Sequence, residues 1–180
     1  MFYDGSLNRG KANIIYEAYQ YANEQGILND YEWIGYWDAD LATPLYEVSN
    51  MFKFLEMNSN SFSSIWGSRI SRLGSNITRS PKRHYLGRIF ATIVANVLGV
   101  KSYDSQCGAK LFTSEVAKRA FDKEFITSWI FDVEILLRLK GEDILEYPLV
   151  EWTDIPGSKV NIAKDIFKVV KDIYRLWKKY

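Results

Sequence analysis

The sequence predicts an α/β fold in which a mostly parallel sheet is flanked by helices. Segments with apolar residues at helical spacing alternate along the chain with short apolar runs that are typical of buried strands. The chain has 180 residues, of which 47% are hydrophobic, and this is enough for one domain with a substantial core. No internal repeat, low-complexity tract or interdomain linker interrupts the alternation.

The first half of the chain alternates between helix and strand. Residues 11–23 carry apolar side chains at helical spacing and are followed by Gly26. The apolar run 33–37 is predicted to be a strand buried on both faces, as in the middle of a parallel sheet. Pro44 is expected to start a helix that continues to about residue 57, and residues 63–67 form the next predicted strand.

The second half continues the pattern with a longer helix, and the positions of its glycines and prolines indicate where elements end. In order, we expect a helix over 81–98 ending at Gly99, a strand over 109–112, a helix over 114–121 capped by Ser114 or Thr113, a helix over 129–140 ending at Gly141, and a strand over 144–152 interrupted at Pro148.

Composition narrows the cellular setting. No apolar run approaches the length of a membrane span, and the segment Met1-Phe2-Tyr3-Asp4-Gly5 lacks the basic start and apolar stretch of a signal peptide. We therefore expect a cytoplasmic protein, or one bound peripherally to the cytoplasmic face of a membrane. Cys107 is the only cysteine, which excludes an internal disulfide or a cysteine metal cluster, and it is expected to be a packing residue.

Charge is strongly segregated along the sequence although the formal net charge is only +1. Residues 1–60 hold nine acids and three bases, whereas no acid lies between Glu56 and Asp104. A solvated helix face is one explanation, but such faces usually mix both signs, and arginine forks suit phosphate oxygens. We expect a small phosphate ligand and no nucleic acid, because no nucleic-acid motif is evident. The basic residues of this stretch are Arg69, Arg72, Arg79, Lys82, Arg83, Arg88 and Lys101.

The most informative motif is Asp38-Ala39-Asp40, at the end of the predicted strand 33–37. Two carboxylates one residue apart in a loop offer oxygen ligands to a hard divalent cation, which can then hold a diphosphate. The motif is short, and a solvated strand end is its structural alternative. The hypothesis is a site for Mg²⁺ or Mn²⁺ and a nucleotide-linked substrate.

Further segments combine with these aspartates into a resemblance that runs from Asn8 to the C-terminus. They are Asn8-Arg9-Gly10-Lys11, Asp38-Ala39-Asp40-Leu41-Ala42-Thr43-Pro44, Gly67-Ser68-Arg69, Asp104-Ser105-Gln106-Cys107-Gly108-Ala109-Lys110-Leu111-Phe112, Trp129-Ile130-Phe131-Asp132-Val133-Glu134 and Gly157-Ser158-Lys159-Val160. Together they resemble family 2 glycosyltransferases, and most closely the dolichyl-phosphate β-glucosyltransferase branch.

The resemblance implies a GT-A fold and transfer of a hexose, expected to be glucose, from a nucleotide diphosphate sugar such as UDP-glucose to a polyprenyl phosphate at a membrane surface. It places the Mg²⁺ or Mn²⁺ on Asp40, with Asp38 nearer the ribose or the metal's waters. Arg69, with one or both of Arg83 and Arg88, is expected to hold the acceptor phosphate, since guanidinium forks bind phosphate bidentately. Backside attack by that phosphate would invert the anomeric carbon.

The same resemblance gives roles to other motif residues. Asp104 and Gln106 match sugar-pocket positions, although a turn or capping role is an alternative. Lys11 is expected at a helix start, where it could bind an anion or be solvated. Asp132 and Glu134 lie two apart on a predicted helix and do not share a face, so only one of them is expected to face the site.

The sequence departs from the family at its start. The family normally opens with an apolar strand and an Asp-Asp-Gly-Ser-type segment that holds the nucleoside, and Asp4-Gly5-Ser6 is not counted as that motif. We expect residues 1–160 to form a GT-A-like catalytic domain lacking its first βαβ part, with self-association or a missing N-terminal partner segment as a consequence. A catalytically inactive binding or partner subunit, and a transferase that elongates a glycan, are the alternatives.

The C-terminal segment carries separate information. Residues 161–180 are expected to form a basic amphipathic helix, with an apolar stripe that either docks on the protein's own core or lies on an anionic membrane. Lys159, just before it, matches a family position that meets phosphate; a flexible surface lysine is the alternative.

Overall fold

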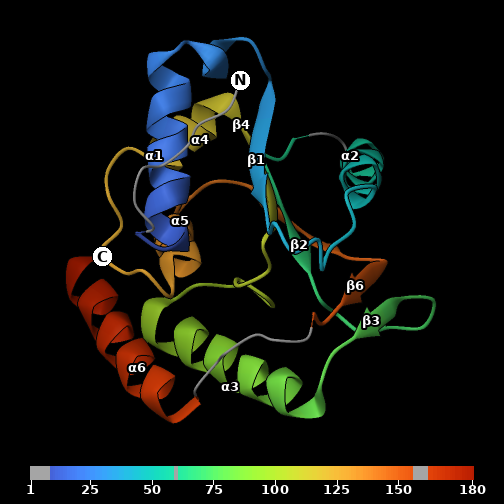
Figure 1. Ribbon diagram of the computed structural model, residues 1–180, viewed down its shortest axis with the longest axis vertical. Helices are drawn as coiled ribbons and strands as arrows, with labels where there is room; N and C mark the ends of the chain where they lie inside the picture. Colours follow the sequence, from blue (N-terminus) through green and yellow to red (C-terminus); the bar gives the residue numbers. More distant parts are fainter. Residues whose placement is uncertain (1–8, 59–60, 156–161) are drawn as a thin grey trace.

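The computed structural model describes residues 9–58, 61–155 and 162–180 (Figure 1). Its elements, in chain order, are α1 (Lys11–Glu24), the short 3-10 helix η1 (Ile27–Asn29), β1 (Trp33–Trp37), α2 (Glu47–Met57), β2 (Ser64–Ser68), β3 (Asn76–Thr78), α3 (Pro81–Leu98), β4 (Ala109–Thr113), α4 (Ser114–Ala120), α5 (Phe131–Arg138), β5 (Ile144–Pro148), β6 (Glu151–Thr153) and α6 (Ile162–Lys179).

The main sheet has the strand order β1-β4-β2-β5, and the predicted α/β class with a central sheet between helices is confirmed. Strands β1, β2 and β5 run in one direction, but β4 lies antiparallel between β1 and β2. The expectation of mostly parallel pairing is therefore wrong for two of the three strand pairs. An apolar pattern indicates that a strand is buried but not in which direction it runs. The loop 99–108 brings the chain back to the edge where β1 and β2 end. Strand β4 therefore starts at that edge and runs antiparallel to both.

Helices cover both faces of this sheet (Figure 1). Side chains of α1, α4 and α5 pack with Trp66 and Phe112 on one face. Met51 and Leu55 of α2 pack with Ile65 on the other face. A third cluster joins α3, α5 and α6, and β3 and β6 form a separate two-stranded parallel sheet. Among the described residues, no helix combines the length and apolarity needed to cross a membrane.

Strand β1 differs from its predicted place in the middle of the sheet. Within the described residues it pairs only with β4, and its side chains are half-buried instead of buried on both faces. Gly35 lies so close to β4 that a Cβ there would come within 2.1 Å of the Lys110 carbonyl oxygen. This close approach explains a glycine inside a strand.

Helix boundaries follow local capping. Helix α3 has the predicted bounds, because the Ser80 hydroxyl accepts the Arg83 N–H at its start and Gly99 adopts a left-handed φ of 68° at its end. Thr113, one of the two predicted caps, accepts the Val116 N–H at the start of α4. Helix α2 begins at Glu47, three residues later than Pro44 predicted.

Candidate functional site

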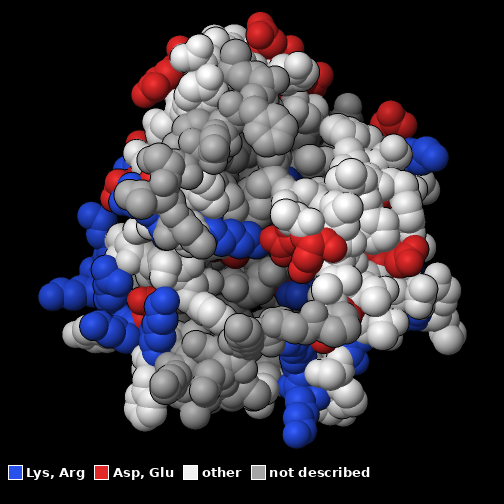
Figure 2. Space-filling model, in the orientation of Figure 1, with Lys and Arg blue, Asp and Glu red and all other residues white. Residues whose placement is uncertain are grey.

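The predicted site residues gather at the edge of the sheet where β1, β2 and β5 end. Asp38 follows β1, Arg69 follows β2, and Gly108 precedes β4, whose reversed direction starts it at the same edge. Ligands of open α/β sheets bind outside these carboxyl ends. Figure 2 shows that acidic and basic side chains meet near the centre of this face of the molecule.

A tight turn presents the two aspartates of the Asp-Ala-Asp motif. The Asp38 carbonyl accepts the Leu41 N–H at 3.1 Å, and Asp40 Oδ1 accepts the Ala42 N–H at 3.0 Å. Leu41 has a φ of 53°, the only positive φ at a non-glycine residue in the described chain. Such a conformation is costly for leucine and is often found at functional sites. The turn leaves the Asp40 side chain exposed at the sheet edge.

Asp38 connects this turn to two other motifs. Its N–H donates to the Gly108 carbonyl at 2.8 Å, and its carboxylate lies where a Cβ on Gly108 would stand, 2.0 Å away. Lys11 Nζ, from the first residue of α1, lies 2.5 Å from Asp38 Oδ1. Lys11 therefore lies beside Asp38, and its predicted anion-binding role stays a prediction. Gly108 must be glycine for the two loops to approach so closely.

Arg69 and Asp104 form a buried bidentate ion pair. Arg69 Nε and Nη2 donate to the two Asp104 carboxylate oxygens at 2.6 and 2.7 Å, and the Arg69 N–H adds a third bond at 3.1 Å. Burial alone would raise the pKa of Asp104, but the guanidinium lowers it to about 2. The acceptor-binding role predicted for Arg69 thus competes with Asp104, because two of its three guanidinium nitrogens are already used.

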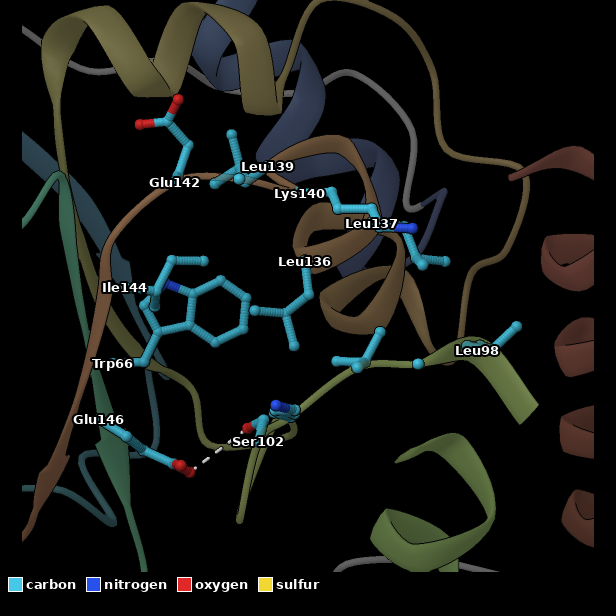
Figure 3. A pocket seen from close by; sticks show the side chains of 14 residues that line it. Trp66, Leu98, Ser102, Leu136, Leu137, Leu139, Lys140, Glu142, Ile144 and Glu146 are labelled. Atoms are coloured by element: carbon cyan, nitrogen blue, oxygen red, sulfur yellow. Dashed lines mark hydrogen bonds between the residues drawn. The ribbon is translucent and has the colours of Figure 1, made fainter. Parts of the chain in front are cut away.

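The segment 102–104 is anchored by Glu146 of β5, which sequence reasoning missed. The Glu146 carboxylate accepts the N–H groups of Tyr103 and Asp104 at 2.8 and 2.7 Å and the Ser102 hydroxyl at 3.3 Å. The same carboxylate lines a pocket of about 320 Å³. Figure 3 shows Glu146 and Ser102 at one end of this pocket, with the side chains of Trp66 and Leu136 between them and helix α5. This pocket lies beside the motif residues and not between them. It matters for the site because Glu146, which holds residues 102–104 in place, is part of its lining.

The other arginines of the basic stretch approach the same region from α3 and the strand before it. Arg88 Nη1 donates to the Tyr103 carbonyl at 2.9 Å and stacks on the Tyr103 ring. Arg83 forms an ion pair with Asp154. Arg79, which no motif singled out, has no hydrogen bond or ion pair with any residue that the structure describes. Burial, and then the charge of Arg69, lower the pKa of Arg79. The Arg79 guanidinium lies against Gly87 of α3, where a Cβ would come within 2.9 Å of Nη2.

The structure separates Asp132 from Glu134. Asp132 is buried on the sheet side of α5, where it accepts hydrogen bonds from Lys110 Nζ at 2.6 Å and from the Tyr36 hydroxyl. Glu134 points away, accepts the Ile126 N–H at 2.8 Å and pairs with Arg138 at 2.8 Å. Of the two, Asp132 is on the side of the sheet edge, and its present partners are protein groups.

Gln106 and Cys107 fill the loop before β4. The Gln106 Nε2 is buried and has no hydrogen-bond partner among the described residues, and its predicted contact with a sugar hydroxyl stays a prediction. Cys107 is fully buried in the apolar cluster that contains Met51 and Ile65, as expected for a packing residue. Burial raises the pKa of its thiol to about 11. Lys159 lies outside the described residues.

The donor set at the sheet edge fits a Mg²⁺ or Mn²⁺ that is held jointly with a substrate. No group of three or more His, Cys, Asp and Glu side chains in the described chain could enclose a metal. Asp38 and Asp40 nonetheless supply two carboxylates on one turn, and Mg²⁺ is usually bound by one or two carboxylates plus substrate phosphates and water. The residues therefore suit a cation that arrives with a diphosphate.

Comparison with known proteins gives a consistent set of relatives. The chain is 34% identical over 149 residues, 79% of its length, to a dolichyl-phosphate β-glucosyltransferase of Dictyostelium discoideum, and covers 45% of that protein. An alignment of 182 positions, which covers 93% of this chain and 52% of the other protein, gives 31% identity to the yeast (Saccharomyces cerevisiae) protein of that name. A glycosyltransferase, AglD, of Haloferax volcanii is 28% identical over 145 residues, or 79% of this chain and 22% of AglD.

No family model matches the sequence. The chain spans about half the length of the first two of these relatives.

Proposed function

Since this chain belongs by sequence to the dolichyl-phosphate β-glucosyltransferase-like group of family 2 glycosyltransferases, we propose that it takes part in transferring glucose from UDP-glucose to a dolichyl-type polyprenyl phosphate. The observation that carries this proposal is the identity of 31–34% over 77–93% of the chain to relatives of that name. The convergence of Lys11, Asp38, Arg69 and Asp104 on one sheet edge supports it.

On the donor side, Asp40 and Asp38 would hold Mg²⁺ or Mn²⁺, which would neutralise the leaving diphosphate. Asp40 is the freer ligand, because Asp38 is already paired with Lys11 at 2.5 Å. Lys11 stands at the N-terminus of α1, where unpaired backbone N–H groups also favour an anion. Lys11 could turn from Asp38 to a phosphate oxygen of a bound diphosphate. A divalent cation held by Asp40 and Asp38 would supply neutralisation of the diphosphate charge.

On the acceptor side, the reaction needs orientation and charge compensation more than a strong base. A phosphate monoester is mostly dianionic near neutral pH, since its second pKa is about 6. We assign the acceptor phosphate to the arginines beside Asp104, namely Arg79, Arg88 and the remaining Nη1 of Arg69. Arg83, five residues before Arg88 on α3, is a further candidate. Attack from the face opposite the leaving diphosphate would invert the anomeric carbon.

The lipid nature of this acceptor leads us to place the reaction at the cytoplasmic surface of a membrane. The basic residues of α6 support this location, because that leaflet carries anionic lipids.

Titration of UDP-glucose and Mn²⁺ into the chain tests the donor site. We expect binding that requires Mn²⁺ and that Asp40→Asn abolishes, because this change removes a charged ligand from an exposed turn without removing a packing contact. Asp30→Asn, at an exposed position before the start of β1 and so at the opposite end of that strand from Asp40, is the matched control and should bind like the parent. Equal melting temperatures for all three proteins would show that the fold is kept.

Binding without metal, or equal binding by Asp40→Asn and the parent, would remove the metal assignment. Transfer to a short-chain polyprenyl phosphate, followed by NMR of the product's anomeric centre, then tests acceptor class and inversion. Transfer to a sugar hydroxyl in its place would identify a glycan-elongating enzyme.

A further inference from the structure

Helix α6 has an apolar face that the core does not use. Its inner face is buried: Ile173 and Leu176 pack with Val94 of α3 and Val133 of α5. A second set of apolar side chains on α6 is largely exposed, and we call it the outer face of α6. Its members, with their exposed fractions, are Phe167 (82%), Val170 (59%), Tyr174 (60%) and Trp177 (58%).

The outer face is a continuous stripe because of its spacing. Positions 167, 170, 174 and 177 fall within a sector of roughly 80° when each residue turns the helix by about 100°. Lys171 and Lys178 border this sector on one side, and both are exposed. Lys168, Arg175 and Lys179 continue the basic side, and Figure 2 shows Lys and Arg side chains gathered over α6. Helix α6 is therefore divided into a buried, an exposed apolar and a basic sector.

The neighbouring helix α3 adds a second apolar stripe. It packs against α6 (Figure 1) and exposes apolar side chains at four-residue spacing. This α3 stripe consists of Tyr85 (68% exposed), Ile89 (57%), Ile93 (44%) and Val97 (43%). Two adjacent helices thus expose aromatic and aliphatic side chains well beyond the isolated apolar residues that are normal on a protein surface.

We propose that the outer face of α6 binds peripherally to a membrane that carries anionic lipids. Tyrosine and tryptophan favour the interface between headgroups and acyl chains, and a basic border complements anionic headgroups. A second copy of the chain fits less well. Helix α6 has six Lys or Arg residues and two Asp, of which Asp172 is buried, so two such faces would bring like charges together.

The proposal is tested by flotation with vesicles made of phosphatidylcholine alone or with phosphatidylserine added. We expect the 180-residue chain to float with the anionic vesicles and much less with the neutral ones, and to be released by high salt. The vesicles contain neither polyprenyl phosphate nor sugar donor, so binding does not depend on the proposed transferase activity. Asp40→Asn should float like the parent even if it loses donor binding.

Variants locate the surface. Phe167→Ser with Trp177→Ser should reduce vesicle binding at least tenfold, because both side chains lose their place in the bilayer. Lys171→Gln with Lys178→Gln should reduce vesicle binding roughly thirtyfold at low salt, at about 1 kcal/mol for each lysine. Leu73→Ser with Met57→Ser is the apolar control, since both residues are highly exposed but lie outside α3 and α6. Lys53→Gln, at an exposed position of α2, is the basic control.

Both controls should float like the parent. Quenching of tryptophan fluorescence by brominated lipids adds a second readout, which Trp177→Phe should weaken while leaving flotation intact. The proposal is overturned if the parent does not float with anionic vesicles, or if the controls lose binding as much as the α6 variants. It is also overturned if light scattering shows that the α6 variants disperse an oligomer, because the face would then be a contact between copies.

Discussion

At Asp104, burial and a neighbouring charge act in opposite directions on one carboxylate, and the charge prevails. Its pKa falls from 3.8 to about 2 in the folded protein because Arg69 binds it bidentately. A depressed carboxylate pKa stabilises the fold above the unfolded value and loses this effect as pH falls through the folded value. The contribution of Asp104, roughly 2 kcal/mol from the size of the shift, is therefore present above pH 4 and is lost between about pH 4 and pH 2.

Asp104→Asn should lower the free energy of unfolding by about 3–5 kcal/mol at pH 7, since it leaves the Arg69 charge buried without its partner. The difference from the parent should narrow as pH falls from 4 to 2, where the parent also loses this carboxylate charge. Urea unfolding of both proteins at several pH values measures it. A difference that stayed constant down to pH 2 would contradict the role given to the ion pair.

Arg79 differs from Arg69 because it has no hydrogen bond or ion pair within the described residues. Replacing Arg79 should therefore change activity without changing stability much. Replacing Arg69 should lower stability as well, because it leaves the buried Asp104 carboxylate without its ion-pair partner. Arg79→Gln should leave the free energy of unfolding unchanged or slightly higher, because it relieves the burial and repulsion that lower the pKa of Arg79. Use of a short-chain polyprenyl phosphate should fall about ten- to a hundredfold, the worth of a charge-assisted contact.

Two rates check this prediction for Arg79→Gln: transfer to the short-chain polyprenyl phosphate, and hydrolysis of the sugar donor without an acceptor. The transfer rate should fall, and the hydrolysis rate should change little. Arg72→Gln, in the exposed turn before β3, is the matched control. If Arg79→Gln lowered both activities and stability together, Arg79 would belong to the scaffold.

At the scale of elements, the sequence predicts the ends of a helix or strand correctly where neighbouring residues in the chain determine them. Helix α3 has its predicted ends because Ser80, Pro81 and Gly99 act within a turn of the helix. Residues 144–152 were predicted as one strand, but the chain divides into β5 and β6, which belong to different sheets. Pro148 indicated the interruption, but the pairing of β6 with β3 depends on a distant segment and left no local signal.

For the site, the motifs predicted which segments meet but not which side chains pair with one another. The contact of Asp38 with Gly108 follows from two predicted loops at one sheet edge. The pairing of Arg69 with Asp104 was missed because each residue, taken alone, suits a ligand. Lys110 offered a signal that was not used: a lysine inside the apolar strand Ala109–Thr113 needs a buried partner, and Asp132 supplies it.

At the scale of the whole molecule, the side of β1 that pairs with no strand among the described residues is the feature with the widest consequence. The Asp38 N–H donates to the Gly108 carbonyl and the Ser114 N–H donates to the Glu32 carbonyl, so residues 38 and 32 form hydrogen-bonded pairs with the two residues that flank β4. Such pairs alternate along an antiparallel ladder. The register therefore directs the backbone groups of Ile34 and Tyr36 toward β4, and those of Trp33, Gly35 and Trp37 away from it.

An open edge of this kind is expected to recruit another strand, because unpaired backbone groups are costly and pair readily with a second chain. We predict that the 180-residue chain self-associates as its concentration rises. In dilute samples the amides of Trp33, Gly35 and Trp37 should exchange quickly with solvent, while those of Ile34 and Tyr36 stay protected. In concentrated samples the three outward amides should become protected together.

Light scattering and amide hydrogen exchange on the same samples decide this prediction, and the alternation within one strand is its internal control. Association through α6 or any other surface would raise the mass without changing exchange in β1. Covering of the edge by the same chain would protect the outward amides at every concentration, at the mass of a monomer. Only pairing between chains links the two readouts, because each intermolecular hydrogen bond formed at this edge then requires a second molecule.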